Sequence, residues 1–365
     1  MEEKFKIQVP QVVLNDLKNR LEHVRWPDEA NEAGWKYGTS LPYIQQLTSY
    51  WLKSYDWRKH ESELNKLSQF TSKVDTILLH FVHERSSKPD AIPVLLLHGW
   101  PDSFYRFHKI IPLLKDSYHV VALSIPGMGF SEKVVLPMKK VGDLCIKLMK
   151  SLGYEHFISA GGDGGSMISL QMAQHHPDSL TGMYLTDVGY PDFSTDFASL
   201  SQPEQQFAGF VQNWWMKEGA FSMVHATKPQ SLAYAFNDSP VGLASWIISM
   251  MSSLSTGEEI EKRFGKDDLI TNIMIYWVTE TIGSSMRIYF TDREFNTSAP
   301  PLVKSKVPAG VAHCPWDAPL PREWAERKTN LLYYSELTRG GHFTAWEEPV
   351  IWANDFNAFV KKLTA

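Results

Sequence analysis

The chain has 365 residues, a net charge of −5 and 43% hydrophobic residues, which are the proportions of a soluble globular protein. This acidic balance, without a basic run, excludes nucleic acid and anionic membrane surfaces as expected partners. Two cysteines, Cys145 and Cys314, are too few for a disulfide framework and lack zinc-site spacing. They favour a reducing compartment, so we expect a cytoplasmic protein without a metal.

The first quarter of the chain, residues 1–75, is predicted to be a tryptophan-rich meander of one strand and two helices that packs on the main domain. The helices are expected within residues 10–26 and 42–57, where apolar residues recur at helical spacing and a proline starts each segment. The charged N-terminus is no signal peptide, and no apolar stretch is long enough to span a bilayer, so no membrane anchor is expected.

Residues 76–190 alternate short apolar runs with helical segments, which predicts a parallel sheet with right-handed crossovers. The apolar runs lie at residues 76–83, 92–99, 119–127, 157–163 and 180–189, and helices are expected at 103–115, 138–152 and 164–175.

Residues 191–300 lose the strand rhythm and are expected to form a helical cap. Residues 301–365 restore two strands and close with a helix. A parallel sheet interrupted in this way predicts an α/β-hydrolase fold, with the helical insert lying as a lid over the carboxyl ends of the strands.

The segment Gly161-Gly162-Asp163-Gly164-Gly165 ends an apolar run and opens a helix. Its spacing is that of a nucleophile elbow, G-x-S-x-G, with aspartate in place of serine. A metal site would need further converging carboxylates or histidines, and a phosphate site would use a lysine and backbone amides. We therefore interpret Asp163 as a nucleophile rather than as a metal ligand, a phosphate ligand or an ordinary turn residue.

The loop "HGWP" follows the apolar run at residues 92–97. In this fold the corresponding loop supplies a backbone N–H group to an oxyanion hole. The amides of Trp100 and Gly164 are therefore the expected oxyanion donors. The side chain of His98 is interpreted as structural.

The expected base is His342, because the fold orders its triad as nucleophile, acid and histidine. For the acid, position after a predicted strand favours Asp317, and Asp187 remains the alternative. Glu347 and Glu348 are interpreted as charges at the N-terminus of the last helix.

An aspartate nucleophile indicates attack on an alkyl carbon. The ester that forms can be hydrolysed at its acyl carbon by water that a histidine activates, whereas serine would form a stable ether. This reasoning favours epoxides or alkyl halides over ordinary esters and amides. An epoxide also needs an acid for the departing alkoxide, and a tyrosine with a pKa of roughly 10 is suited to that role.

Over nearly its whole length the chain resembles the microsomal-type epoxide hydrolases, including the juvenile hormone enzymes and their soluble microbial relatives. The segments that carry the resemblance include "YWLKSYDWRKHESELNKLSQF", "LLLHGWPDSFYRF", "GGDGG", "ATKPQSLAYAFNDSPVGLASWI", "SSMRIYF" and "RGGHFTAWEEP". The resemblance implies an α/β-hydrolase fold with an N-terminal meander, no cofactor, and the soluble form, because the chain starts at the meander.

Residue by residue, the resemblance implies Asp163 as nucleophile, His342 as base and Asp317 as the partner of that base. Asp317 stands in "CPWD" where the family has a segment such as "FPxE", so the acid is one methylene shorter. The resemblance also implies that Tyr289, in "SSMRIYF", is the lid tyrosine that polarises the epoxide oxygen.

Two positions depart from the family pattern. Phe221 occupies the place of a second lid tyrosine, and Gly164 occupies the place of a tryptophan that follows the nucleophile. Together the two changes indicate either a roomier and less polar substrate pocket or weaker and redirected epoxide opening. We expect Pro101, Phe221 and Phe343 to line the pocket.

The leading hypothesis is hydrolysis of a small apolar epoxide by water to a vicinal diol, through a covalent aspartyl ester. Phe221 and Gly164 motivate an alternative, a biosynthetic relative that cyclises or otherwise opens an epoxide on a bulky substrate. A third hypothesis is a non-catalytic ligand-binding protein, against which the complete Asp-His-Asp set argues. A homodimer and a setting in detoxification or secondary metabolism are further expectations.

Overall fold

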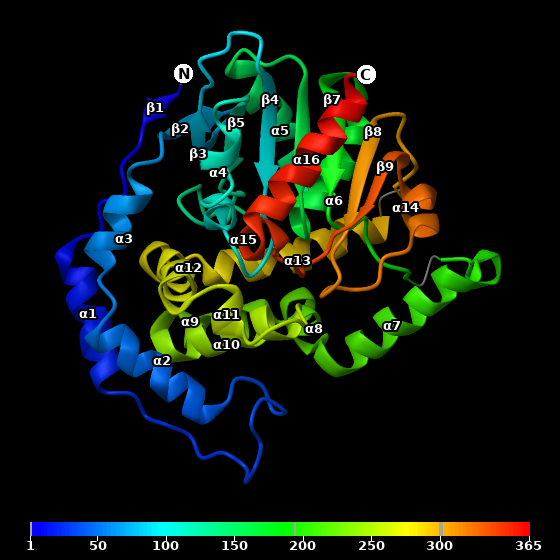
Figure 1. The fold of residues 1–365 in the computed structure, drawn as a ribbon. Helices are drawn as coiled ribbons and strands as arrows, with labels where there is room; N and C mark the ends of the chain where they lie inside the picture. Colours follow the sequence, from blue (N-terminus) through cyan, green and yellow to red (C-terminus); the bar gives the residue numbers. More distant parts are fainter. Residues whose placement is uncertain (1, 193–194, 299–301) are drawn as a thin grey trace.

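The computed structural model describes residues 2–192, 195–298 and 302–365. A nine-stranded sheet runs through these residues in the order β1-β2-β3-β5-β4-β6-β7-β8-β9 (Figure 1). From β5 to β9 neighbouring strands are parallel, whereas β1, β2 and β3 pair in antiparallel fashion and β3 is antiparallel to β5. The strands are β1 Glu3–Lys4, β2 Gln69–Val74, β3 Ile77–Glu84, β4 Ile92–Leu97, β5 Tyr118–Leu123, β6 Phe157–Gly161, β7 Leu180–Leu185, β8 Pro308–His313 and β9 Asn330–Glu336.

Helices cover both faces of the sheet, which explains why the central strands are continuous apolar runs. Helices α5 and α6 lie behind the sheet in the view of Figure 1, and α16 crosses in front of it. The side chains from Val94 to Leu97 in β4 have no exposed surface. The helices of the sheet domain are α4 Ile111–Leu114, α5 Met138–Ser151, α6 Gly164–His175, α14 Arg322–Lys328, α15 Thr344–Glu347 and α16 Pro349–Leu363.

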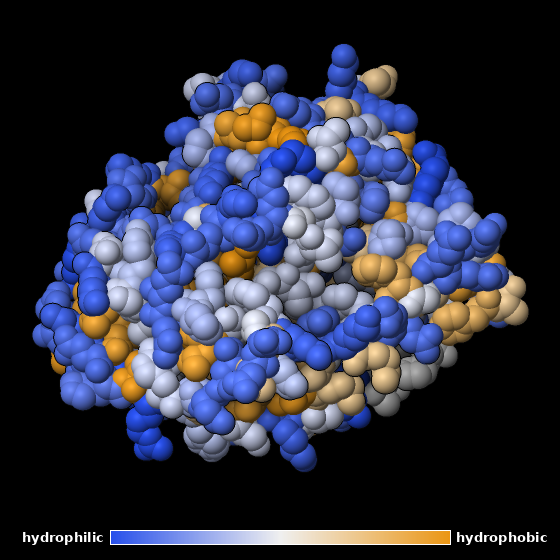
Figure 2. All heavy atoms as spheres, turned by 60° about the horizontal axis from the view of Figure 1, so that its bottom comes forward, coloured by the Kyte–Doolittle hydropathy of each residue, from blue (hydrophilic) through white to orange (hydrophobic). Residues whose placement is uncertain are grey.

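The cap consists of helices that lie below the arrowheads of the parallel strands in Figure 1, as predicted for a lid over their carboxyl ends. On the face seen in Figure 2, polar side chains surround smaller groups of apolar ones, and most apolar side chains of α10 and α12 are buried. The cap helices are α7 Gln202–Glu218, α8 Ala220–Thr227, α9 Pro229–Asp238, α10 Pro240–Ser253, α11 Ile260–Arg263, α12 Lys266–Thr279 and α13 Ile282–Ser298. The predicted boundary at residues 300 and 301 lies outside the described residues.

The N-terminal region differs from the prediction of one strand and two helices. It contains α1 Gln11–Glu22, α2 Leu41–Lys53 and a third helix, α3 Trp57–Leu64, and it contributes β1 and β2 to the sheet. The third helix begins where the side chain of Asp56 accepts a hydrogen bond from the backbone N–H of Arg58, which caps the free N-terminus of the helix.

The continuous helix predicted at residues 103–115 is wrong. The structure has a 3-10 turn at Phe104–Phe107 and then the four-residue helix α4. Pro112 explains the break, because its ring would clash with the carbonyl of His108 in a continuous helix and it has no N–H to donate.

Register in the parallel part of the sheet decides where the loops meet. Leu97 of β4 and Leu185 of β7 both pair with Gly161 at the end of β6, so the loops that follow these strands leave the sheet side by side. Strands β8 and β9 likewise end together, at the pair His313 and Glu336. None of the helices in the described ranges combines the length and apolarity that crossing a bilayer requires.

Candidate active site

Asp163 stands at a sharp turn between β6, which ends at Gly161, and α6, which begins at Gly164. Its backbone has φ 55° and ψ −131°, a conformation that a residue with a side chain adopts only under strain. The backbone N–H of Asp163 donates a hydrogen bond to Oδ2 of Asp187 at 2.6 Å. This bond holds the turn, and the structure thus shows the elbow that the glycine spacing predicts.

The first and last glycines of the elbow are required by close packing. A Cβ atom at Gly161 would lie 2.6 Å from the carbonyl carbon of Gly165, and one at Gly165 would overlap the carbonyl oxygen of Leu97. At Gly164 the nearest atom, Cα of Gly99, would be 3.7 Å away, which is an ordinary contact. A side chain therefore fits at 164 but not at 161 or 165.

This difference predicts contrasting stabilities for two matched substitutions. Gly165→Ala is expected to lower the free energy of unfolding by about 3 kcal/mol or more, because neither backbone can yield. Gly164→Ala, the control, is expected to change it by less than about 1 kcal/mol. Urea unfolding followed by circular dichroism measures both values, and equal stabilities would contradict the packing argument.

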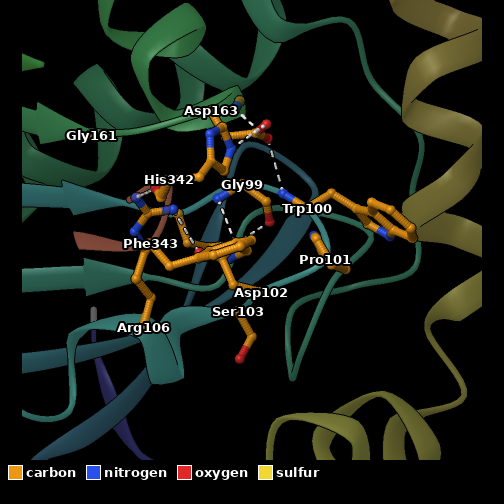
Figure 3. A network of polar contacts seen from close by, with 12 residues as sticks. Gly99, Trp100, Pro101, Asp102, Ser103, Arg106, Gly161, Asp163, His342 and Phe343 are labelled. Atoms are coloured by element: carbon orange, nitrogen blue, oxygen red, sulfur yellow. Dashed lines mark hydrogen bonds and ion pairs between the residues drawn. The ribbon is translucent and has the colours of Figure 1, made fainter. Parts of the chain in front are cut away.

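Two backbone amides hold one oxygen of the Asp163 carboxylate. The N–H group of Trp100 donates to Oδ1 at 3.0 Å (Figure 3). The N–H group of Gly164 donates to the same oxygen at 2.6 Å. Gly99 allows this approach, because a Cβ there would overlap Oδ1. The two amides that are predicted to be oxyanion donors thus lie together on the carboxylate of Asp163.

The other carboxylate oxygen faces His342. Nε2 of His342 lies 3.2 Å from Oδ2 of Asp163, and Nδ1 lies 2.9 Å from Oδ2 of Asp317. A carboxylate can only accept, so Nδ1 carries a proton toward Asp317. The side chain of Asp163 is 26% exposed and that of His342 only 2%, so a substrate can reach the carboxylate while the imidazole is shielded.

Charge coupling shifts the pKa values of this pair. Burial alone would lower the pKa of His342, but the charges of Asp317 and Asp163 outweigh it and raise this pKa well above its usual value. Burial opposes the charge of Asp163, yet His342 and the two amides hold its pKa below the usual value. Both effects favour an imidazolium beside an ionised carboxylate.

The structure places Asp317, rather than Asp187, against the imidazole. Asp187 accepts the N–H of Asp163 instead, and burial, reinforced by the charge of Asp163, raises its pKa to about 6. In the described ranges no group of three or more histidine, cysteine or acidic residues is arranged to hold a metal ion.

Aromatic side chains from the cap contact the loop of residues 98–101, which we call the oxyanion loop. The ring of Phe221, on α8, stacks on that of Trp100 with centroids 5.6 Å apart. The ring of Tyr289, on α13, packs edge-on against both, with its centroid 6.1 Å from that of Trp100 and 6.0 Å from that of Phe221. Burial and the charge of Asp163 raise the pKa of the Tyr289 phenol well above 10, so the group is a hydroxyl within electrostatic reach of the carboxylate.

The two other predicted pocket residues differ in their surroundings. Pro101 is buried beside Trp100, and its carbonyl accepts a hydrogen bond from Asn272 at 2.8 Å. The prediction that Phe343 lines the pocket is wrong, since its side chain has no exposed surface. The loop that turns His342 toward Asp163 sends the next side chain into the core, against Arg106.

A buried ion pair beneath the site was not predicted from the sequence. Nη1 of Arg106 donates to Asp102 at 2.8 Å, and Nη2 donates to the backbone carbonyl of His342 at 2.6 Å. Asp102 in turn accepts the N–H of Gly99 at 2.9 Å (Figure 3). The pair thereby joins the oxyanion loop to the histidine loop. Its one local signal is the i, i+4 spacing of the two residues in "PDSFYR".

His98 is structural, as predicted. It is fully buried, its Nδ1 lies 2.9 Å from the carbonyl of Gly99, and its Nε2 accepts the N–H of Ile125 at 3.1 Å. Both ring nitrogens therefore have backbone partners, one in the same loop and one just after β5.

Comparison with known proteins assigns the chain to a family. The family described as "Epoxide hydrolase N terminus" matches residues 2–107, and the "alpha/beta hydrolase fold" family matches residues 92–218. Epoxide hydrolase 1 of Sus scrofa is 34% identical over 399 residues, covering 98% of this chain and 88% of the relative. Juvenile hormone epoxide hydrolase 1 of Ctenocephalides felis is 30% identical over 397 residues, covering 98% of this chain and 85% of the relative.

Solved structures agree with this assignment. The crystal structure of juvenile hormone epoxide hydrolase from the silkworm Bombyx mori superimposes with a TM-score of 0.92 at 26% identity, covering 100% of this chain and 95% of that one. Sequence and structure thus match over nearly the whole length, through the meander, sheet and cap. The chain therefore belongs to the epoxide hydrolases, a family of enzymes built on the α/β-hydrolase fold.

Proposed function

We propose that this enzyme hydrolyses an apolar epoxide to a vicinal diol through a covalent ester on Asp163. The observation that carries the proposal is that the two oxygens of this carboxylate have different partners. Oδ1 is held by two amides, and Oδ2 faces the imidazole of His342. One oxygen is thus placed to attack and the other to receive charge.

In the first step Oδ2 of Asp163 attacks an epoxide carbon. The epoxide C–O bond breaks, its electron pair passes to the departing oxygen, and the hydroxyl of Tyr289 gives that oxygen a proton. An alkoxide is far more basic than a phenol, so the raised pKa of Tyr289 does not prevent this transfer. The surrounding rings of Trp100 and Phe221 favour an apolar substituent on the epoxide.

In the second step water hydrolyses the ester. The imidazolium of His342 first gives its proton to the phenolate that step one leaves on Tyr289. Nε2 then takes a proton from the water, whose oxygen attacks the acyl carbon of Asp163, and Asp317 stabilises the resulting imidazolium. Negative charge develops on Oδ1, where the amides of Trp100 and Gly164 lie. The bond between the acyl carbon and the former Oδ2 then breaks, and the second proton of the water passes from the new carboxyl group to the departing oxygen. The diol leaves, and His342 keeps the proton that it carries in the resting site.

Isotope labelling tests the covalent path. A single turnover of styrene oxide with enzyme in excess, in ¹⁸O-water, is expected to place the label in the peptide that contains Asp163 and to leave the diol unlabelled. Mass spectrometry of digest and product measures both. Label that enters the diol directly would rule out the ester.

Phe221→Tyr is expected to accelerate epoxide opening by roughly tenfold, because a second hydroxyl would then stand beside that of Tyr289 and share the departing charge. Rapid-quench measurement of ester formation from styrene oxide gives the rate. Phe236→Tyr is the matched control, because Phe236 is also a buried cap phenylalanine and packs on Trp246 instead. Equal rates in wild type and Phe221→Tyr would show that the missing hydroxyl does not limit opening.

No contact in the described ranges favours the alternative of epoxide cyclisation over hydrolysis. The homodimer, the cytoplasmic location and the metabolic setting stay predictions.

A further inference from the structure

The cap reaches His342 through a segment that follows α10 and includes α11. We call residues 255–264 the clasp. Its Thr256 donates a backbone hydrogen bond to the carbonyl of Trp316 at 2.9 Å, next to Asp317. At its other end the ring of Phe264 packs on Phe343 with centroids 5.8 Å apart. The clasp therefore contacts both loops that carry the base and its acid.

The closest of these contacts is made by Ser255. Its Oγ accepts the backbone N–H of His342 at 2.9 Å and donates to Oε1 of Glu347 at 3.0 Å. The same oxygen of Glu347 accepts the N–H of Phe343 at 2.9 Å. Ser255 is 3% exposed and His342 2%, so water does not replace these bonds. The backbone on both sides of the histidine is thus anchored through one carboxylate.

Glu347 does not act as the helix-terminal charge that its position suggests. It ends the short helix α15, and its side chain has no exposed surface. Its Oε2 has no hydrogen-bond partner in the described ranges and lies 3.7 Å from Nη1 of Arg263, which belongs to the clasp. The cap thereby supplies both the hydroxyl and the cation that surround this carboxylate.

Ser255 also packs closely against the residue that precedes His342. A Cβ atom at Gly341, the residue before the histidine, would overlap Oγ of Ser255. The hydroxyl thus lies directly against the backbone at the point where the loop turns His342 toward Asp163.

We propose that Ser255, held by Glu347, is a positioning residue of the cap for the base His342. It fixes the backbone from which the imidazole reaches Asp317 at 2.9 Å and Asp163 at 3.2 Å. The inference rests on the proposed function, in which His342 acts only in the second step. Loss of the Ser255 hydroxyl therefore slows ester hydrolysis and spares ester formation.

Separate measurement of the two steps tests this role. With styrene oxide as the probe, rapid quench and intact-mass spectrometry follow the ester on Asp163 as it forms and decays. In Ser255→Ala, decay is expected to slow by about tenfold or more, because small displacements of a catalytic group cost rate steeply. Formation is expected to stay within about twofold of wild type, so the ester accumulates.

A second variant at position 255 and one variant elsewhere serve as controls. Ser255→Thr keeps the hydroxyl and is expected to restore the decay rate. Ser284→Ala is the control, because Ser284 is also a buried cap serine but donates to the carbonyl of Gly127 at 2.6 Å, away from the histidine loop. It is expected to leave decay within about twofold of wild type.

The outcomes are separable. A wild-type decay rate in Ser255→Ala, or equal slowing of both steps, overturns the positioning role. Absence of any ester in the wild type overturns the proposed function instead. If Ser255→Ala fails to fold, Ser255→Cys decides, since it is close in shape but a weak acceptor, and decay at the wild-type rate overturns the inference.

Discussion

Asp163→Ala abolishes epoxide hydrolysis, with kcat/KM expected to fall by a factor on the order of 10⁵. The reason is chemical, because no other carboxylate in the described ranges has one oxygen held by two backbone amides and the other facing an imidazole. Steady-state assays with styrene oxide measure the loss, and intact-mass spectrometry is expected to show no adduct on the variant.

Asp75→Ala is the matched control for this substitution. Asp75 also has a positive φ, 53°, so alanine is placed on a positive-φ backbone there as well, but Asp75 pairs with Lys147 at the surface. The control is expected to keep wild-type turnover. Residual activity of Asp163→Ala within about a hundredfold of wild type would assign the attack to water or to another residue.

His342→Gln is expected to trap the ester. Attack by Asp163 does not require the imidazole, so each chain gains the mass of one epoxide, while turnover falls by a factor on the order of 10⁴ for want of a base. Intact-mass spectrometry after mixing with styrene oxide counts the adduct, and a peptide digest locates it.

His119→Gln provides the comparison for the histidine variant. Its Nδ1 accepts the N–H of Ser86 at 3.1 Å, outside the contacts of the site, and turnover without a lasting adduct is expected. Absence of an adduct on His342→Gln, together with lost turnover, would show that the imidazole is already needed for attack.

The elbow could be predicted because its determinants are local. Glycines at 161 and 165 and the single aspartate between them lie in one strand-turn-helix segment, and the structure shows why a Cβ is excluded at both glycines. The placement of Asp317 against His342 also agrees with the prediction, since chain order in a parallel sheet decides which loop ends emerge together.

Other parts of the site depend on contacts between distant segments, which no local pattern reveals. Arg106 reaches the carbonyl of His342 across 236 residues of sequence, and Ser255 reaches its N–H across 87. Phe343 was misplaced for a related reason. Adjacency to the base does not indicate which way a loop side chain turns, and here the turn buries it against Arg106.

The contact between His342 and Asp163 couples the two steps of the proposed reaction. In the resting site the negative charge of Asp163 helps to keep the imidazole protonated, by raising its pKa. On the proposed path, ester formation neutralises that charge, so burial, which lowers the same pKa, then has only Asp317 opposing it. The imidazole becomes a better proton acceptor only once the substrate is attached. In the proposed mechanism, attack by the carboxylate therefore prepares the imidazole to act as a base in the next step, and the order of the two steps follows from a single change of charge.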